Sequence, residues 1–397
     1  MKHLSWKAFA AGLVCCLCAC GGGNSNNDEP APSPNPDPTP EPTPAVAFAK
    51  GADISWVTEY ESKGYKFYNA KGEERECTKL MKELGLNAIR LRVWVDPKAH
   101  GNWCNTADLV EKAKRAKAEG MEVMVDFHYS DWWADPGQQH KPASWKGLSL
   151  PKLKEALANH TKEVLQALKG VGVTPRWVQV GNEIRPGMLW DEDKNLSGAS
   201  WDIKANEVKD MGWTSTEVKY PMNWANLGAF IQTGYDAVKA VCPEAIVIVH
   251  LDNGHDNGLY TWFFDELKKN GGKWDMIGMS IYPYWTMQSN PSYTADRTIT
   301  DCISNVNSVA ARYNCDVMIV ETGMDCGDGK GGVASATTLA SGRDLLARLI
   351  KQCRDNTNGR CKGVFYWEPE CRPNEGYRLG AFTNDGKPTV IMDAFKE

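Results

Sequence analysis

Eight short apolar runs that alternate with amphipathic helical stretches limit the fold of this chain more than any other feature. The runs are AKGADI, NAIRLRVWV, MEVMVDFH, RWVQVGN, AIVIVHL, WDMIGMSIY, DVMIVE and GVFYW. Helical patterns such as TADLVEKAKRAKAEG and LPKLKEALANHTKEVLQALKG lie between them. Strand–helix alternation repeated eight times predicts an α/β fold, a parallel (β/α)8 or TIM barrel, in a single domain. A doubly wound open sheet is the alternative, but no G-x-G-x-x-G turn follows the first run.

Two of these predicted strands carry charged residues on one face. Because successive side chains of a strand point to opposite sides, NAIRLRVWV and MEVMVDFH each divide into an apolar face and a charged face. The charged faces carry Arg90, Arg92, Asp126 and His128. The apolar faces must meet the helices, so the charged faces must point into the barrel, where charge is costly unless it is paired. Both strands carry this charge toward the C-terminal end, where barrels of this kind hold their active sites.

Polar and aromatic residues gather at the C-terminal ends of the predicted strands. The set comprises Asp53, Arg90, Arg92, Asp126, His128, Asp131, Asn182, Glu183, His250, Asp252, Tyr282, Glu321, Trp367 and Glu368. Several carboxylates among such side chains suit glycoside hydrolysis, which needs one protonated carboxyl group and one ionised carboxylate. In the stretch VQVGNEI, Asn182 and Glu183 end an apolar strand. Pro186 and Gly187 follow, so the cap of a regular helix does not explain this pair.

Five segments resemble one known family. They are GADISW, IRLRVWVDP, DFHYSDWWADPGQQHKPASW, VQVGNEI and IVETG, and they are similar to glycoside hydrolase family 53, the endo-β-1,4-galactanases. The similarity runs from about Gly51 to the C-terminus, and the segment from His128 to Trp145 is its specific part. The resemblance implies retaining endo-hydrolysis, by double displacement, of β-1,4-galactosidic bonds in galactan, the type I arabinogalactan side chains of pectin.

The resemblance also implies roles for two carboxylates and an arginine. Glu183 corresponds to the acid/base of the family's clan and Glu321 to its nucleophile. Their carboxyl groups should then lie about 5–5.5 Å apart. Arg90 resembles the clan arginine that keeps the nucleophile ionised, and Arg92 is the alternative.

Further strand-end residues are expected to contact the sugar. Asn182 resembles the clan residue that binds the sugar 2-hydroxyl, and Trp367 resembles the tryptophan beneath the reacting sugar. The other substrate-binding candidates are Asp53, Asp126, His128, Asp131, Trp132, His250 and Tyr282. For His250 and Tyr282, plain packing in the barrel interior is the alternative. For Asp126 and His128 a metal pair is the alternative, but no further His and carboxylate cluster accompanies them.

A structural calcium ion is doubtful, and no cofactor is expected to be required. Bacterial members of the family often carry a calcium loop after the seventh strand, whereas this chain has DCGDGKGG there. Asp325 and Asp328 are candidate metal ligands only if that loop binds calcium.

Nine cysteines follow residue 45, and an exported chain can oxidise them. Cys302 with Cys315 and Cys326 with Cys371 are plausible pairs, although spacing alone does not establish connectivity. A bridge between Cys326 and Cys371 would clamp the last two loops in place of calcium.

The N-terminal segment is not part of the barrel. Lys2 and Lys7 precede an apolar run that ends LCACGGG, which fits a lipoprotein signal peptide over residues 1–20 with Cys20 as the lipid anchor. Ordinary signal cleavage is the alternative. Residues 21–45 are a Gly/Asn-rich and then Pro-rich tether, which alternating prolines keep extended. The (β/α)8 glycosidase domain then covers residues 46–397, and we expect an exported, membrane-anchored lipoprotein of the outer membrane or cell surface.

The net charge of −5 and the lack of a basic tract argue against a nucleic-acid partner. We expect a monomer whose partners are galactan and, through the lipid anchor, a membrane. Two other functions stay open from the sequence. One is another glycosidase of the same clan, a mannanase or a cellulase. The other is a non-catalytic glycan-binding surface lipoprotein, against which the presence of both Glu183 and Glu321 argues, since binding needs neither.

Overall fold

The computed structural model describes residues 47–190 and 222–396. The predicted signal peptide of residues 1–20, the lipid anchor Cys20 and the tether of residues 21–45 lie outside the described residues, so these remain predictions. Among the described helices, none combines the length and the apolar character that crossing a membrane would require.

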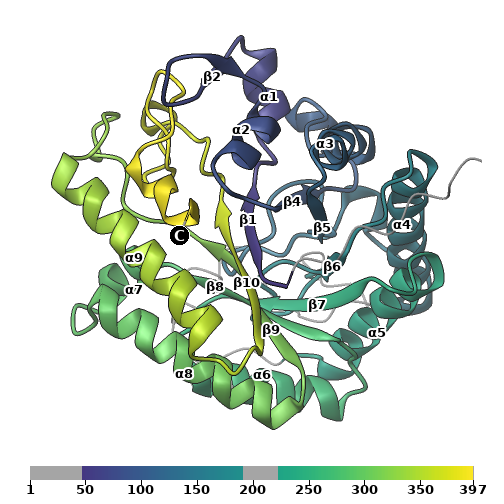
Figure 1. The fold of residues 1–397 in the computed structure, drawn as a ribbon. Helices are drawn as coiled ribbons and strands as arrows, with labels where there is room; N and C mark the ends of the chain where they lie inside the picture. The colour runs from purple at the N-terminus through teal and green to yellow at the C-terminus, as the bar shows by residue number, and fades with distance from the viewer. Residues whose placement is uncertain (1–46, 191–221, 397) are drawn as a thin grey trace, which may run out of the picture. The chain divides into compact units, whose positions relative to one another are not determined.

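Eight parallel strands close into a barrel, as the alternation predicted (Figure 1). Around the barrel they follow one another in chain order, and the last strand pairs with the first. The strands are β1 (Ala49–Asp53), β4 (Ala88–Val93), β5 (Glu122–Phe127), β6 (Trp177–Val180), β7 (Ile246–Leu251), β8 (Met276–Ile281), β9 (Asp316–Thr322) and β10 (Cys361–Trp367). The predicted (β/α)8 barrel is confirmed, and each of the eight apolar runs supplies one barrel strand.

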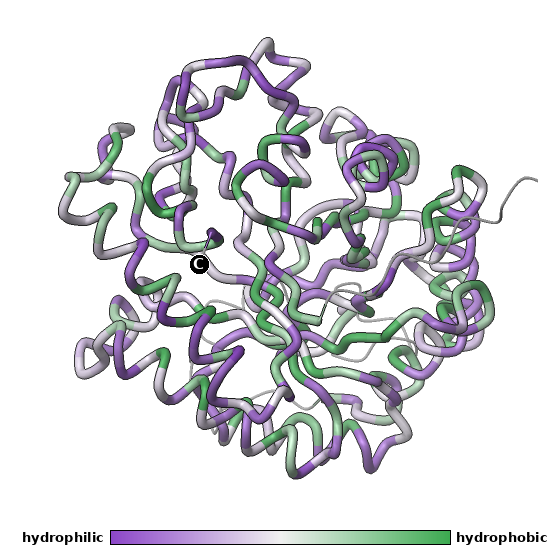
Figure 2. The backbone as a smooth tube through the Cα atoms, viewed as in Figure 1, coloured by the Kyte–Doolittle hydropathy of each residue, from purple (hydrophilic) through white to green (hydrophobic). Residues whose placement is uncertain are grey.

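Helices cover the outside of the barrel. They are α1 (Val57–Ser62), α2 (Cys77–Glu83), α3 (Thr106–Ala118), α4 (Leu150–Gly170), α5 (Trp224–Val241), α6 (Asn257–Lys269), α7 (Pro283–Ser289), α8 (Ala295–Tyr313) and α9 (Ala336–Asp355). A two-stranded hairpin of β2 (Phe67–Tyr68) and β3 (Glu74–Arg75) is added between α1 and α2. Several helices begin where a side chain caps a free amide, as Asn105 does for α3 and Ser335 for α9. In Figure 2, β7 is mostly hydrophobic, whereas the helices alternate in hydropathy because only one side of each is buried.

Two apolar layers follow from the side-chain alternation of the strands. The outer layer, between strands and helices, includes Leu91, Val93, Val123, Val125 and Phe127. The inner layer fills the barrel with Ala49, Ala88, Met124, Trp177, Ile248, Met276, Met318, Val320 and Phe365. Small residues make room for large ones, since a Cβ on Gly51 would lie 2.2 Å from the Phe365 ring. The barrel is therefore a packed core, and substrate can only be held above it.

The nine cysteines of the described residues are all unpaired, so the two predicted disulfides are not formed. Cys302 lies within α8 and Cys315 beyond its end, so about 16 Å of helix separates them, far more than the about 7 Å that a disulfide spans. The thiols of the other pair have different partners. Cys371 Sγ accepts the Tyr60 hydroxyl at 3.3 Å, and Cys326 Sγ donates to the Phe382 carbonyl at 3.7 Å.

Candidate active site

A cavity of about 980 Å³ opens above the inner apolar layer, at the C-terminal ends of the strands. Both predicted catalytic carboxylates, Glu183 and Glu321, line it. Four of the ten predicted substrate contacts also reach its surface: His128, Asn182, Tyr282 and Trp367. The other six do not belong to its lining, and they are Asp53, Arg90, Asp126, Asp131, Trp132 and His250. The cavity therefore brings the carboxylates together, and four of these six residues are fully buried, namely Asp53, Arg90, Asp126 and His250.

Glu183 follows β6 in a strained backbone conformation. Its φ is +47°, the left-handed region that non-glycine residues rarely adopt. Gly181 two residues earlier has a φ of +84°, so the chain turns sharply as soon as the strand ends. The Ser280 hydroxyl on β8 donates to Glu183 Oε1 at 2.6 Å. Backbone strain of this kind is held by surrounding structure and occurs often at functional sites.

Glu321 reaches the cavity because β9 contains an irregularity. Met318 and Val320 belong to the inner layer and Ile319 to the outer one, so regular alternation would turn Glu321 outward. The pairing of β8 with β9 shifts by one residue between Met279 and Ser280, and this shift points Glu321 inward. There, Arg90 Nη2 lies 2.8 Å from Glu321 Oε1, and the Tyr282 hydroxyl donates to Oε2 at 3.0 Å.

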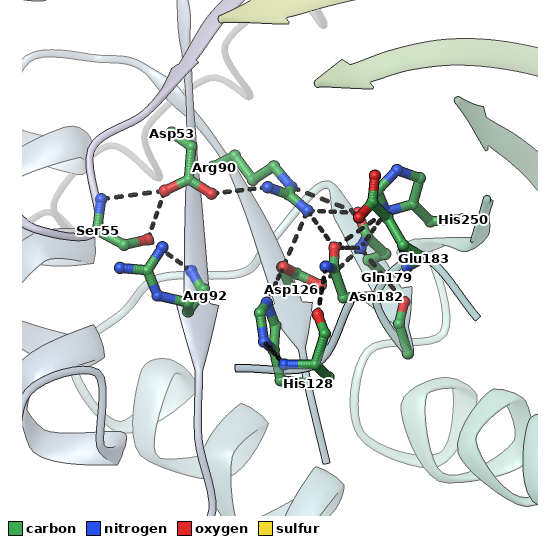
Figure 3. A network of polar contacts seen from close by, with 12 residues as sticks. Asp53, Ser55, Arg90, Arg92, Asp126, His128, Gln179, Asn182, Glu183 and His250 are labelled. Atoms are coloured by element: carbon green, nitrogen blue, oxygen red, sulfur yellow. Dashed lines mark hydrogen bonds and ion pairs between the residues drawn. The ribbon is translucent and has the colours of Figure 1, made fainter. Parts of the chain in front are cut away.

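Arg90 is the centre of a buried polar network (Figure 3). Its guanidinium also bonds Asp53 at 2.8 Å and Asp126 at 2.9 Å, and it donates to Asn182 Oδ1 at 2.9 Å. Of the two candidate arginines, Arg90 therefore contacts Glu321. Arg92 instead pairs with Glu368 at 2.7 Å.

A chain of side chains leads from β6 to Glu183. Gln179 donates to His250 Nδ1 at 2.9 Å, and Nε2 of the same ring lies 2.7 Å from the Ser280 hydroxyl. Ser280 in turn donates to Glu183. Burial and the nearby Arg90 and His128 lower the pKa of His250 well below its ordinary range, so this histidine is neutral.

The same Ser280 hydroxyl lies 2.6 Å from Glu183 Oε1 and 3.5 Å from Glu321 Oε2. The distance from Glu183 Oε1 to Glu321 Oε2 cannot exceed the sum of these two distances, because both are measured from the same serine oxygen. This sum is shorter than the about 6.5–9.5 Å between the carboxyl groups of inverting glycosidases. The spacing therefore suits a retaining enzyme, in which one carboxylate attacks the sugar directly.

The two carboxyl groups differ in their proton affinity. Burial raises the pKa of Glu183 well above its ordinary value, and the negative charges of Glu321 and Asp252 raise it further. Burial also raises the pKa of Glu321, but Arg90 opposes this, and the value is about 7. A proton shared by the pair therefore resides on Glu183.

Three of the predicted substrate-binding residues, Asp131, Trp132 and His128, have structural partners. The Asp131 carboxylate accepts the backbone amides of Asp96 at 3.0 Å and Ala143 at 2.8 Å. Trp132 stacks on His100 with ring centroids 3.6 Å apart, and its neighbour Trp133 lines the cavity instead. His128 Nδ1 accepts the Ala134 amide at 3.1 Å, and its Nε2 lies 3.0 Å from Asp126. Both nitrogens are thus engaged, and no metal-binding group of three or more His, Cys, Asp or Glu side chains exists within the part of the chain that the structure describes.

Sequence reasoning missed several residues of the site. Gln179 and Ser280 belong to the polar network, and Trp56, Tyr377, Trp285 and Tyr293 line the cavity. Strand alternation was a usable signal for two of them, since Gln179 shares a face with Trp177 and Ser280 shares one with Tyr282. The four aromatic residues lie outside the strands, where no periodic pattern indicates direction.

The family model of glycosyl hydrolase family 53 matches residues 49–389. This chain belongs to that family. It is 31% identical to an endo-β-1,4-galactanase of Bacillus subtilis, over 88% of this chain and 75% of the relative. An arabinogalactan endo-β-1,4-galactanase of Thermothelomyces thermophilus is 30% identical, over 81% of this chain and 89% of the relative. A solved fungal β-1,4-galactanase structure superposes with a TM-score of 0.71 and 28% identity, over 87% of this chain and 98% of the other.

The loop after β9, where calcium is expected in bacterial members of the family, does not fit the ion here. Arg378 Nε and Nη2 bond the two Asp325 oxygens at 2.6 and 2.8 Å. Asp328 Oδ1 accepts the backbone amides of Lys330 and Gly332 at 2.7 and 2.8 Å. The Arg378 carbonyl also accepts the amides of Cys326 and Gly327. A guanidinium group thus links the last two loops, where the predicted Cys326–Cys371 bridge is not formed.

Replacing Arg378 by Met should loosen this link. We expect the free energy of unfolding to fall by about 1 kcal/mol, since the pair is partly exposed, and KM to rise because Tyr377, the neighbour of Arg378, lines the cavity. Arg312→Met is the matched control, since Arg312 bonds Asp265 through Nε and Nη2 on the outer surface, so this change should leave KM unchanged.

Treatment with a chelator should leave the melting temperature of the unaltered protein unchanged. A large drop on chelation would mean that a metal ion holds the loops.

Proposed function

We propose that this chain hydrolyses internal β-1,4-galactosidic bonds of galactan, the type I arabinogalactan side chains of pectin, with retention of configuration. The observation that carries the proposal is the Glu183–Glu321 pair, bridged by one serine hydroxyl in a cavity lined by aromatic residues. Flat aromatic faces suit sugar rings. The galactan specificity is supported by relatives that are named endo-β-1,4-galactanases.

In the first step, the Glu321 carboxylate attacks the anomeric carbon while Glu183 protonates the departing glycosidic oxygen. Ser280 donates to Oε1 of Glu183, so the proton that is transferred sits on Oε2. The Arg90 guanidinium and the Tyr282 hydroxyl oppose the effect of burial on the pKa of Glu321 and so favour the ionised form that attacks. The products of this step are a free chain end and a glycosyl ester of Glu321.

In the second step, the Glu183 carboxylate takes a proton from water, and the resulting oxygen nucleophile attacks the same anomeric carbon. The ester bond to Glu321 breaks, which restores both carboxyl groups to their starting protonation. Two inversions give net retention. Asn182, held by Arg90, is proposed to bind the sugar 2-hydroxyl, and Trp367 to lie beneath the reacting sugar.

Export, the lipid anchor at Cys20 and a monomeric state are part of the proposal. A long proline-rich tether between a lipid anchor and a glycosidase would present the cavity to pectin fragments at the cell surface.

Purified enzyme should release reducing ends from potato and lupin galactan but not from mannan or a soluble cellulose. An internal cut shortens long chains early, so size-exclusion chromatography of a brief digest should show a rapid fall in chain length. Galactose as the sole early product would contradict internal cleavage, and preferred attack on mannan or cellulose would contradict the substrate. Binding to galactan with no new reducing ends would indicate a glycan-binding protein.

The two carboxylates should fail in different ways when changed to Ala. Glu183→Ala should still form the glycosyl-enzyme from an aryl β-galactoside oligomer with a good leaving group, because that step then needs no proton. Added azide should release the stalled intermediate as a β-linked azide. Glu321→Ala cannot form the intermediate and should give at most an α-linked azide. The anomeric configuration of each adduct, measured by NMR, decides the assignment, and the opposite pattern would reverse the two roles.

Two hydrogen-bond donors should move opposite limbs of the pH–rate profile. Tyr282 lowers the pKa of Glu321, so Tyr282→Phe should raise that pKa and shift the acid limb of kcat/KM to higher pH. Ser280 lowers the pKa of Glu183, so Ser280→Ala should keep the acid protonated longer and shift the alkaline limb to higher pH. A shift of the alkaline limb alone in Tyr282→Phe, or of the acid limb alone in Ser280→Ala, would contradict the assignment.

A further inference from the structure

A second pair of carboxyl groups lies beside the cavity, outside the reaction described above. After β10 the chain turns through Glu368, whose φ is +44°, and continues to Glu370. Both side chains are fully buried. Glu368 is well supplied with donors, since Arg92 Nη1 bonds its Oε1 at 2.7 Å and the Trp56 amide donates to its Oε2 at 3.2 Å.

Glu370 differs because neither of its oxygens receives a hydrogen bond from another residue's donor group within the described residues. Apart from its own backbone amide, the group that interacts with its carboxyl as a hydrogen-bond partner is the carboxyl of Glu368. Two oxygens that both only accept cannot bond to each other unless a proton lies between them. A fully buried carboxylate without a cation or a donor would cost several kcal/mol, and such a group takes up a proton instead.

We propose that Glu370 is uncharged and donates its proton to the Glu368 carboxylate, and that this carboxyl pair positions the aromatic wall of the cavity. The aromatic wall consists of Trp56, Trp133 and Trp367, all of which line the cavity. The proposal goes beyond the hydrolytic pair, since neither glutamate contacts the reacting atoms.

The link from the pair to the wall runs through Arg92. Its guanidinium carbon lies 4.3 Å from the centre of the Trp133 ring and 5.6 Å from that of Trp56. Its Nε and Nη2 make no hydrogen bond to the described residues, and the guanidinium carbon also lies 5.1 Å from the centre of the Trp94 ring. Glu368 thus holds Arg92 through Nη1 and Trp56 through its backbone amide. The Trp56 ring then contacts Trp133 and Trp367, with centroids 5.8 and 5.3 Å apart.

The groups around Glu370 favour its neutral form. The titratable or charged groups of the described residues that face the pair are Asp53 of β1, Tyr60 of α1, Cys77 of α2, Arg92 of β4, Cys104 and Cys371. Arg92 is the one cation in this set, and Glu368 already bonds it. The Tyr60 hydroxyl donates to Cys371 and not to Glu370. Burial and the charge of Glu368 therefore raise the pKa of Glu370 well above its ordinary value.

The shared proton makes a defined contribution to stability. The unfolded chain loses this proton near the ordinary glutamate pKa of about 4.3, whereas the folded chain keeps it to much higher pH. The stabilisation is therefore fully present below about pH 4. As the pH rises above that value, the folding equilibrium constant falls by about tenfold per pH unit until the folded chain also loses the proton.

Glu370→Gln tests this directly, because the amide has the same shape and donates the same hydrogen bond at every pH. Urea unfolding of the full chain should be measured from pH 5 to pH 8 for both proteins. The folding constant of the unaltered chain should fall by about tenfold more per pH unit than that of the variant, since the variant has no such proton to lose. Parallel pH curves would overturn the shared proton.

Two further variants test the positioning role. Glu368→Gln deprives Arg92 of its anion, so it should lower stability and activity far more than Glu370→Gln, although both changes are isosteric. Glu370→Leu removes the hydrogen-bond donor. It should raise KM for galactan oligomers more than it lowers kcat, and it should change the tryptophan fluorescence. Glu370→Gln should keep KM and the fluorescence near the values of the unaltered chain. Equal effects of the two Gln variants, or an unchanged KM in a folded Leu variant, would overturn this role.

The KM measurement rests on the proposed galactan hydrolysis, whereas the unfolding measurement does not. If the Leu variant does not fold, the comparison of the two Gln variants still decides on the pair. A chain that cleaves no galactan would contradict the proposed function, and the unfolding curves would then decide on the shared proton by themselves.

Discussion

The Arg90 guanidinium is the group on which the site depends. It is fully buried and lies within 2.9 Å of three carboxylates, those of Asp53, Asp126 and Glu321. A buried charge of this kind is tolerated only because its partners satisfy it, and removal of one partner leaves the others uncompensated. Because these partners come from β1, β5 and β9, the ion pairs of Arg90 fix the C-terminal ends of these three strands relative to β4. The orientation of Glu321 is thus set by the same contacts that allow charge inside the barrel.

The two arginines of β4 hold different layers of the site. Arg90 faces polar groups and fixes the carboxylate that is proposed to attack the sugar. Arg92, two residues later on the same face, points to Glu368 and to the tryptophan rings. One strand therefore supports both the proposed nucleophile, through Arg90, and the aromatic wall, through Arg92.

Local backbone strain accompanies the positions that matter most. Glu183 and Glu368 both adopt left-handed φ values just after a barrel strand, at +47° and +44°. Glu321 depends on the register shift of β9. For Glu321 a regular strand would aim the side chain outward. In all three cases, tertiary contacts hold the side chain in place, with Ser280 for Glu183, Arg92 for Glu368 and Arg90 for Glu321. The regular barrel supplies the frame, and its irregular ends orient the functional groups.

The sequence by itself determined the barrel, because the period of its apolar runs leaves few other ways to bury them, and it predicted the candidate carboxylates, because parallel strands bring their C-terminal ends to one place. Strand alternation alone could not tell Arg90 from Arg92, since both share a face; the family resemblance favoured Arg90, and the packed site shows that Arg90 contacts Glu321. Regular alternation would even have turned Glu321 outward. The unpaired cysteines and the Arg378–Asp325 link were also decided in three dimensions. The period of the apolar residues shows which face of a helix or strand is buried. Which ion pairs, hydrogen bonds and disulfides form between residues far apart in the sequence depends on distances of a few ångströms, and only the folded chain sets these distances.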